Sequence, residues 1–233
     1  MLLPRLKSKV SARYILMKRI YLVRHGKTFI NKYNKMQGWC DTPLTDEGRE
    51  GAEKAAEALQ DLPLDIALSS NTLRASETCE IIMKKNCNRD LLQHLAYPYF
   101  REHFYGYFEG MDNDVAWRMV GAAHGFVSAA DLAKHATCDQ IADWIKEADP
   151  YHDAEDSKEF WARWQKGFDL IQQLDGAENI LLVSHGFAIK SLAQRFAVDG
   201  IDTTVHPRNS SISTLVMDEA GNLQMTSYNK LQL

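Results

Sequence analysis

IYLVRHGKT, residues 20 to 28, is a short apolar run that leads directly into an arginine, a histidine and a glycine. NILLVSHGF, residues 179 to 187, makes the same transition late in the chain. Both runs have the length and the branched side chains of buried strands. Because ligands of open α/β sheets bind at the carboxyl ends of the strands, this pattern predicts that His25 and His185 face one crevice.

The rest of the chain predicts an alternation of strands and helices. Strands are expected at 19–23, 65–68, 179–184, 211–217 and 223–228. Helices are expected after Thr45, within 69–85, at about 187–197 and over most of 111–176, where an aromatic stripe at helical spacing indicates core packing. Such an order predicts an α/β three-layer sandwich with a mostly parallel central sheet covered by helices.

Length and composition favour one globular domain. The chain has 233 residues, of which 45% are apolar, and we expect a single domain over 18–233 with a helical variable segment at about 111–176. Residues 1–17 are expected to be an N-terminal extension or an ordered arm, since Met17 directly precedes the first strand.

Charge and cysteine usage restrict the partners and the compartment. The net charge of −4 gives no general attraction to nucleic acid, and no apolar run is long enough to span a membrane, so neither partner is expected. The four cysteines form no CxxC pair, which favours a reducing, cytoplasmic compartment and predicts no metal site. The oligomeric state cannot be inferred from this sequence.

The segment RHGKTFINKYNKMQGWCDTPLTDEG, residues 24 to 48, resembles the signature of the histidine phosphatase superfamily, which includes the cofactor-dependent phosphoglycerate mutases. Later segments continue the resemblance in the family's order: SSNTLRASET carries Arg74, EHFYGYFEG carries Glu102, VSHG carries His185 and NSSIS carries Asn209 to Ser211. The resemblance implies a phosphoglycerate mutase-like fold. It also implies that phosphate is bound by Arg24, Asn31, Gln37, Gly38, Arg74, His185 and Gly186.

The residue types themselves suit phosphoryl transfer. The planar forks of Arg24 and Arg74 match the oxygens of a phosphate dianion. A neutral imidazole is a nucleophile at pH 7, so His25 is expected to attack phosphorus and become a phosphohistidine without help from a metal. His185 would donate a hydrogen bond to a non-bridging oxygen. The leaving group also needs an acid, and only the resemblance assigns that role to Glu102.

Several residues have a plainer interpretation. Arg74 alone would be as consistent with a solvated charge, Glu109 is more simply a surface acid, and Gly106 and Gly110 are expected in turns. The remaining histidines are expected to be non-catalytic, although His103 could line the mouth of the site; they are His94, His103, His124, His135, His152 and His206. Lys27 stands where the family most often has glutamate, and either solvent or an anionic substrate could face it.

The segment after Glu102 favours a phosphatase over a mutase. Mutases of this family carry Arg-His-Tyr-Gly after their acid, then a lysine, then a tryptophan followed by two arginines. This chain has His103, Phe104 and, after Trp117 and Arg118, Met119. We therefore expect a hydrolase of small phosphorylated metabolites with no cofactor. The alternatives are a mutase that uses 2,3-bisphosphoglycerate and an inactive phospho-ligand binding protein.

Overall fold

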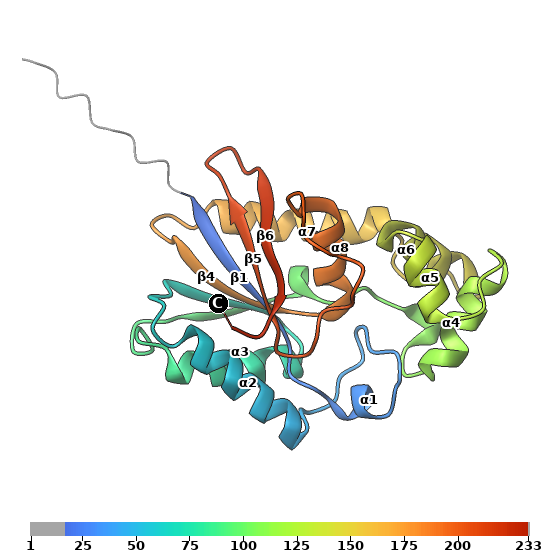
Figure 1. Cartoon of the computed structure of the whole chain (residues 1–233), viewed down its shortest axis with the longest axis horizontal. Coiled ribbons are helices and arrows are strands. Elements are labelled where there is room, and N and C mark those ends of the chain that lie inside the picture. The colour runs from blue at the N-terminus through green and yellow to red at the C-terminus, as the bar shows by residue number, and fades with distance from the viewer. Residues whose placement is uncertain (1–16, 233) are drawn as a thin grey trace, which may run out of the picture.

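A six-stranded mixed sheet forms the centre of the computed structural model, which describes residues 17–232 (Figure 1). The strands are β1 Lys18–Arg24, β2 Ile66–Ser70, β3 His94–Tyr97, β4 Asn179–Ser184, β5 Ile212–Met217 and β6 Leu223–Lys230. The helices are α1 Phe29–Lys32, α2 Asp46–Leu59, α3 Leu73–Lys85, α4 Asn113–Ala122, α5 Ala129–His135, α6 Cys138–Ala148, α7 Ser157–Gln172 and α8 Gly186–Phe196. The short 3₁₀ turns are η1 Pro98–Phe100 and η2 Gly106–Phe108. The arm expected at the N-terminus falls, except for Met17, outside the described residues.

The strand order is β3-β2-β4-β1-β5-β6, so strands distant in sequence lie side by side. The four strands from β3 to β1 are parallel, and β5 and β6 are antiparallel to their neighbours. The expected mostly parallel α/β sheet is therefore confirmed. Strand β3 was not predicted, because it is a short edge strand with no fully buried residue and no run of branched apolar side chains.

Alternate residues of the central strands pack against helices on opposite faces. On β1, Ile20 and Leu22 point into the apolar core beneath α7 and α8, whereas Tyr21 and Val23 point into the core beneath α2 and α3. This two-residue period is the geometry of a strand buried on both sides. The aromatic stripe of α7, centred on the fully buried Trp164, belongs to the first of these cores, as expected.

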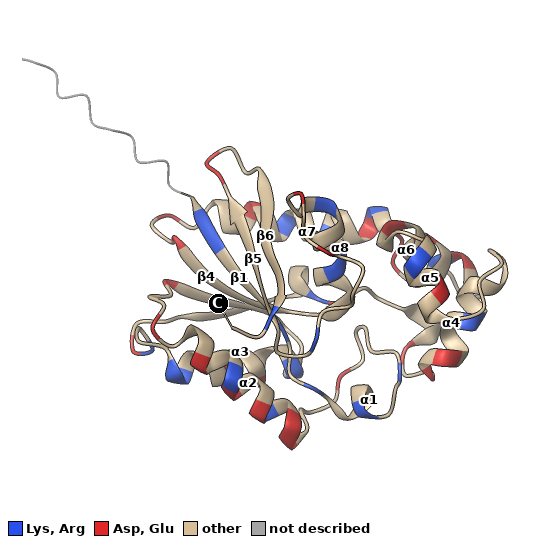
Figure 2. Ribbon diagram, in the orientation of Figure 1, with Lys and Arg blue, Asp and Glu red and all other residues tan. Residues whose placement is uncertain are grey.

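The segment from α4 to α6 builds a third apolar core beyond one end of the sheet (Figure 1). Its helices begin at capping side chains, such as Ser128 before α5 and Thr137 before α6, that accept the free backbone N–H groups of the first turn. Acidic and basic residues are interspersed over the outer helices (Figure 2). Within 17–232, no helix combines the length and the apolar character needed to cross a bilayer.

Candidate active site

The two histidines meet because β1 and β4 are parallel neighbours in register. Arg24 lies opposite Ser184, so the next residue of each strand, His25 and His185, leaves the sheet at the same point. The backbone N–H of His25 donates to the carbonyl of Ser184 at 2.9 Å, and the two imidazole centroids are 5.1 Å apart. The repeated His-Gly pattern thus brings the two imidazoles together, and of the two only His25 lines the pocket.

Arg74, on the first turn of α3, connects the two rings. Its side chain is fully buried, its Nε donates to Nε2 of His25 at 3.3 Å, and its Nη2 bonds Nδ1 of His185 at 3.0 Å. Its other bonds go to the carbonyls of Gly38 at 2.6 Å and Cys40 at 2.9 Å and to Oδ1 of Asp41 at 3.0 Å. A solvated position for Arg74 is therefore excluded.

These contacts set which nitrogen of each ring carries the proton. Nδ1 of His25 lies 2.8 Å from the carbonyl oxygen of Gly26, so it is the protonated nitrogen, and Nε2 keeps its lone pair. Because the guanidinium of Arg74 can only donate, Nδ1 of His185 is the acceptor and its Nε2 carries hydrogen. Burial and the nearby Arg74 hold the pKa of both imidazoles well below the usual value, so both are neutral.

Nε2 of His185 is buried and has no hydrogen-bond partner among the described residues. An unpaired buried N–H is costly to a folded protein unless a ligand satisfies it. His25 therefore presents a lone pair, and His185 presents a donor.

Glu102 is a buried carboxyl at the N-terminus of α8. Its Oε1 accepts the backbone N–H groups of Ala188 at 2.7 Å and His103 at 3.1 Å, and its Oε2 accepts that of Phe187 at 2.9 Å. Burial raises the pKa of Glu102 above its usual value, although the three N–H groups act in the opposite direction. Such a group can hold a proton at a higher pH than an exposed glutamate does.

Arg24 lies beside the start of α8. Its Nη1 donates to the carbonyl of Pro207 at 2.6 Å, whereas its buried Nε has no partner within the described part of the chain. A Cβ on Gly186 would lie 3.0 Å from this Nε and 2.4 Å from Nε2 of His206. The close approach of these two side chains therefore requires glycine at position 186.

A polar network holds the loop that follows the first histidine. Oε1 of Gln37 accepts from the hydroxyl of Thr28 at 2.6 Å and from Nδ2 of Asn31 at 3.3 Å. Nδ2 of Asn209 donates to the carbonyl of His25 at 2.9 Å. Asn209 of the late Asn-x-Ser motif therefore binds the backbone of His25 itself.

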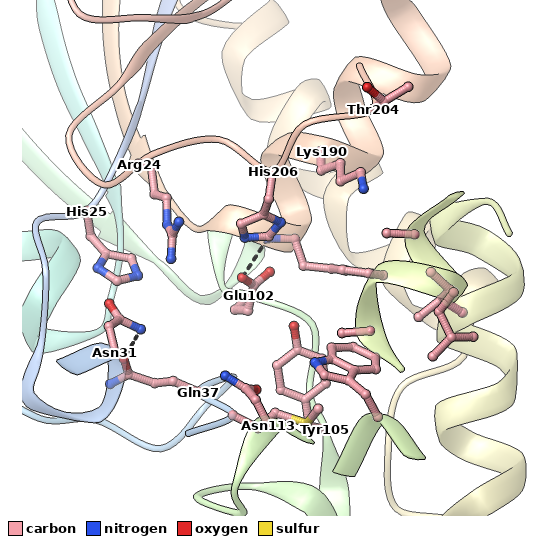
Figure 3. A pocket seen from close by; sticks show the side chains of 17 residues that line it. Arg24, His25, Asn31, Gln37, Glu102, Tyr105, Asn113, Lys190, Thr204 and His206 are labelled. Atoms are coloured by element: carbon pink, nitrogen blue, oxygen red, sulfur yellow. Dashed lines mark hydrogen bonds between the residues drawn. The ribbon is translucent and has the colours of Figure 1, made fainter. Parts of the chain in front are cut away.

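The pocket beside these groups has a volume of about 300 Å³ (Figure 3). Of the residues predicted for the site, those that line it are Arg24, His25, Asn31, Gln37 and Glu102. The other predicted site residues lie outside that lining; they are Gly38, Arg74, His185 and Gly186. The N–H of Gly38 donates to Oε2 of Glu109 at 3.1 Å, so it is committed within the protein.

Other lining residues were not anticipated. They include Tyr105, Asn113, Trp117, Leu132, Ile141, Phe187, Lys190, Thr204 and His206. His206, which was expected to be non-catalytic, lies in the pocket wall, and the desolvation there together with Arg24 lowers its pKa. Lys190 could have been suspected, because it lies four residues after Gly186 and so on the same side of the helix. No sequence signal marked Thr204 or Asn113.

The structure tests the simpler interpretations that the sequence suggested for Glu109, His103 and Lys27. Glu109 is not a surface acid: it accepts the N–H groups of Gly38, Trp39, Cys40 and Tyr105 and so holds the loop before Asp41. His103 does not line the mouth, because it is fully buried against Tyr105, Phe160 and Phe187. Lys27 forms a 2.8 Å ion pair with Glu47 at the surface, as its solvent interpretation expects.

The comparisons with known proteins concern the chain as a whole. The family model described as histidine phosphatase superfamily (branch 1) matches residues 20–230. A solved structure titled phosphoglycerate mutase from Bacillus anthracis is 32% identical, with a TM-score of 0.85, and the match covers 93% of this chain and 95% of that one. The alpha-ribazole phosphatase from Shigella flexneri shares the fold, with a TM-score of 0.67 and 21% identity over 92% of this chain and 98% of that one.

Curated relatives carry the mutase name. A 2,3-bisphosphoglycerate-dependent phosphoglycerate mutase of Methanosarcina mazei is 26% identical over 75% of this chain and 79% of its own length. The protein of the same name in Nautilia profundicola is 39% identical, but that match spans only 45% of this chain and 46% of the relative.

Proposed function

Because the chain belongs to the histidine phosphatase superfamily (branch 1), we propose that it hydrolyses small phosphomonoesters through a phosphohistidine at His25, without a metal ion. One observation carries the proposal: a single buried arginine orients two neutral imidazoles so that one offers a lone pair and the other an N–H. The four cysteines are free thiols, which supports the cytoplasm as the compartment.

In the first half-reaction, Nε2 of His25 attacks phosphorus and the P–O bond to the leaving group breaks. The contact of 3.3 Å from Arg74 to this nitrogen is long for a hydrogen bond, so it leaves the lone pair available. The leaving oxygen takes the proton of Glu102, whose raised pKa keeps that proton available. The N–H of His185 donates to a non-bridging oxygen as negative charge spreads over the transferring group.

In the second half-reaction, water attacks the phosphohistidine and the P–N bond breaks. The carboxylate of Glu102 accepts the proton of that water, which restores the acid for the next cycle. Inorganic phosphate leaves, and His25 regains its lone pair with its Nδ1 proton still directed at Gly26. The positive charge that the reaction needs is supplied by Arg24 and Arg74, which is why we propose no metal.

A 2,3-bisphosphoglycerate-dependent mutase is the second candidate, and the names of the relatives favour it. Lys190 and His206 also add basic side chains to the pocket that the sequence comparison with mutases did not include. Against it, His103 is buried away from the pocket and Met119 is exposed on α4, so neither replaces a cation of the mutases.

The test is a phosphate-release screen over phosphorylated metabolites, run beside a coupled assay for interconversion of 3-phosphoglycerate and 2-phosphoglycerate. We expect phosphate release to exceed interconversion even when 2,3-bisphosphoglycerate is added. Faster interconversion that this bisphosphate stimulates would establish the mutase. Tight binding of phosphomonoesters without turnover would instead point to an inactive phospho-ligand binding protein.

A further inference from the structure

The pocket has two chemically different parts. Its phosphate end holds His25, Arg24 and Asn31, and its far part is walled by apolar and aromatic side chains of the α4–α6 segment and its neighbours. These side chains are Met36, Tyr105, Trp117, Leu132, Ile141 and Phe187. Because the phosphate binds at the first end, the far part must receive the leaving group.

Lys190 is the unusual residue of this far part. It projects from α8 into the pocket, on the side of Glu102 away from His25 in Figure 3. Its exposed fraction is only 5%, and among residues 17–232 the structure gives its ammonium no hydrogen bond or ion pair. By contrast, the more exposed Lys27, Lys85 and Lys146 each contact a carboxylate.

A mostly buried lysine without a counter-charge is costly, since burial removes part of the water that solvates its charge. No carboxylate of the described residues offsets this cost through an ion pair with Lys190. The free position of its ammonium in the pocket wall therefore suits an anion that arrives with the substrate.

The surroundings of Lys190 limit the charge of that anion. His206 is a basic residue of the same wall, and desolvation together with Arg24 and Lys190 lowers its pKa to about 3, so its imidazole is neutral. Thr204 and Asn113, which also line the pocket, offer uncharged donors. One ammonium with neutral donors balances a monoanion, whereas a second phosphate dianion would require a further cation or a guanidinium fork.

We propose that the substrates are phosphomonoesters whose leaving group has an apolar, flat body and a carboxylate, and that Lys190 binds this carboxylate. This inference rests on the proposed phosphatase activity. The pocket volume of about 300 Å³ lies at the low end for small-molecule sites, which fits a phosphate and one aromatic ring better than a nucleotide.

The test compares 4-carboxyphenyl phosphate with its uncharged analogue 4-carbamoylphenyl phosphate. The quantity measured is the ratio of kcat/KM for the two esters in the unmodified protein and in Lys190→Met, whose side chain is of similar length. Differences in leaving-group reactivity cancel when the two ratios are compared. Lys166→Met, an exposed lysine of α7, is the matched control for loss of one positive charge.

We expect the unmodified protein and Lys166→Met to prefer the carboxylate ester. In Lys190→Met the ratio of kcat/KM for the two esters should fall by about tenfold or more, which corresponds to the free energy of a hydrogen bond to a charged group. Equal ratios in all three proteins, or a preference for the amide, would overturn the inference. If both esters are hydrolysed and the kcat/KM ratio is the same in all three proteins, the inference on Lys190 fails but the proposed function stands. If neither ester releases phosphate, the proposed function itself is contradicted.

If neither ester is hydrolysed, a binding measurement still tests the inference on Lys190. His25→Ala cannot form the phosphohistidine, so calorimetric titration with each ester reports binding alone. Tighter binding of the carboxylate ester to His25→Ala, lost in His25→Ala/Lys190→Met, supports the role of Lys190 whatever the activity. Equal affinities of the two esters for His25→Ala would refute it.

Discussion

One guanidinium contacts both imidazoles, and this residue-scale contact assigns a different task to each ring. Since Arg74 only donates, it leaves His185 with its hydrogen on the outer nitrogen, while the carbonyl of Gly26 leaves His25 with its lone pair there. The two rings are chemically identical in the unfolded chain. Their difference in role comes from the partners on their inner nitrogens.

Replacement of His25, the proposed nucleophile, tests this assignment directly. We expect His25→Ala to lower kcat by at least about 10³-fold, as loss of a nucleophile typically does. An acid-labile phosphoenzyme should be trapped during turnover of the unmodified protein and be missing from the variant. Substantial residual activity together with a trapped phosphoenzyme in His25→Ala would place the covalent step on another residue.

The proposed role of Glu102 as the acid can be tested with substrates whose leaving groups differ in their need for a proton. We expect Glu102→Gln to lower kcat by about 10²-fold or more for an alkyl phosphate, whose leaving oxygen needs a proton, and by much less for p-nitrophenyl phosphate. Because the pKa of Glu102 is raised, alkyl ester hydrolysis in the unmodified protein should fall as pH rises through that pKa. An equal loss for both esters would show that Glu102 does not act as the acid.

The site residues that belong to a motif could be predicted from the sequence. The residues that only the fold brings near the pocket were missed. His25, Arg74 and His185 follow strands or start a helix in a recurring pattern, so their meeting could be expected. Lys190 and His206 reach the pocket from a helix and a loop whose paths depend on tertiary packing. Glu109 looked like a surface acid because four backbone N–H groups leave no mark in a sequence.

At the scale of elements, α7 holds the segment that carries the acid. Arg163 of α7 pairs with both oxygens of Glu155 at 2.6 and 2.7 Å. It also donates to the carbonyl oxygens of Tyr99 at 2.9 Å and of Arg101 and Glu102 at 3.0 Å. Helix α7 thus positions the backbone of Glu102 without contacting the pocket.

We therefore expect Arg163→Lys to lower kcat for alkyl phosphates by about tenfold, since a single ammonium cannot replace the fork. KM and the hydrolysis of p-nitrophenyl phosphate should change less, because the phosphate-binding groups stay in place. Lys158→Met, an exposed lysine on the same helix, is the control and should retain activity. Proportional losses for both esters would indicate general damage to the fold in place of a misplaced acid.

Among the elements, the central strands were the most predictable. β4 was predicted with its observed bounds and β1 within one residue at each end, because both are continuous apolar runs. β3 and the four-residue helix α1 were missed, since an edge strand and a single turn depend on neighbours more than on their own composition.

At the scale of the whole molecule, buried neutral histidines make stability depend on pH. The pKa values of His25 and His185 are well below normal and that of His103 falls to about 3, so the unfolded chain binds protons more readily than the folded one. The free energy of unfolding must then fall as pH drops below about 6.5. The raised pKa of Glu102 acts in the opposite sense.

From pH 7.5 to 5.5, each such histidine should remove up to about 1.4 kcal/mol of stability, measured by urea unfolding. His25→Ala should therefore show a shallower pH dependence than the unmodified protein, by up to one histidine's share. Parallel curves for the two proteins would mean that His25 takes up its proton equally easily in the folded state.

Metal dependence is also a property of the whole enzyme. We expect prolonged dialysis against a chelator to leave kcat unchanged, since Arg24 and Arg74 already supply fixed positive charge next to the imidazoles. Activity lost on dialysis and restored by magnesium or zinc alone would refute the proposed metal-free reaction.

The pairing of β1 with β4 has a consequence for how the enzyme acquires activity. His25 is synthesised early and His185 late, so a growing chain carries half of the proposed site until β4 inserts between β2 and β1. Contacts between residues so distant in sequence close slowly, because a long loop must be ordered first. A slip of one residue in that pairing would turn Val183 and its neighbours to the wrong face. Recovery of the proposed phosphatase activity during refolding should therefore report the moment when this sheet has closed in its correct register.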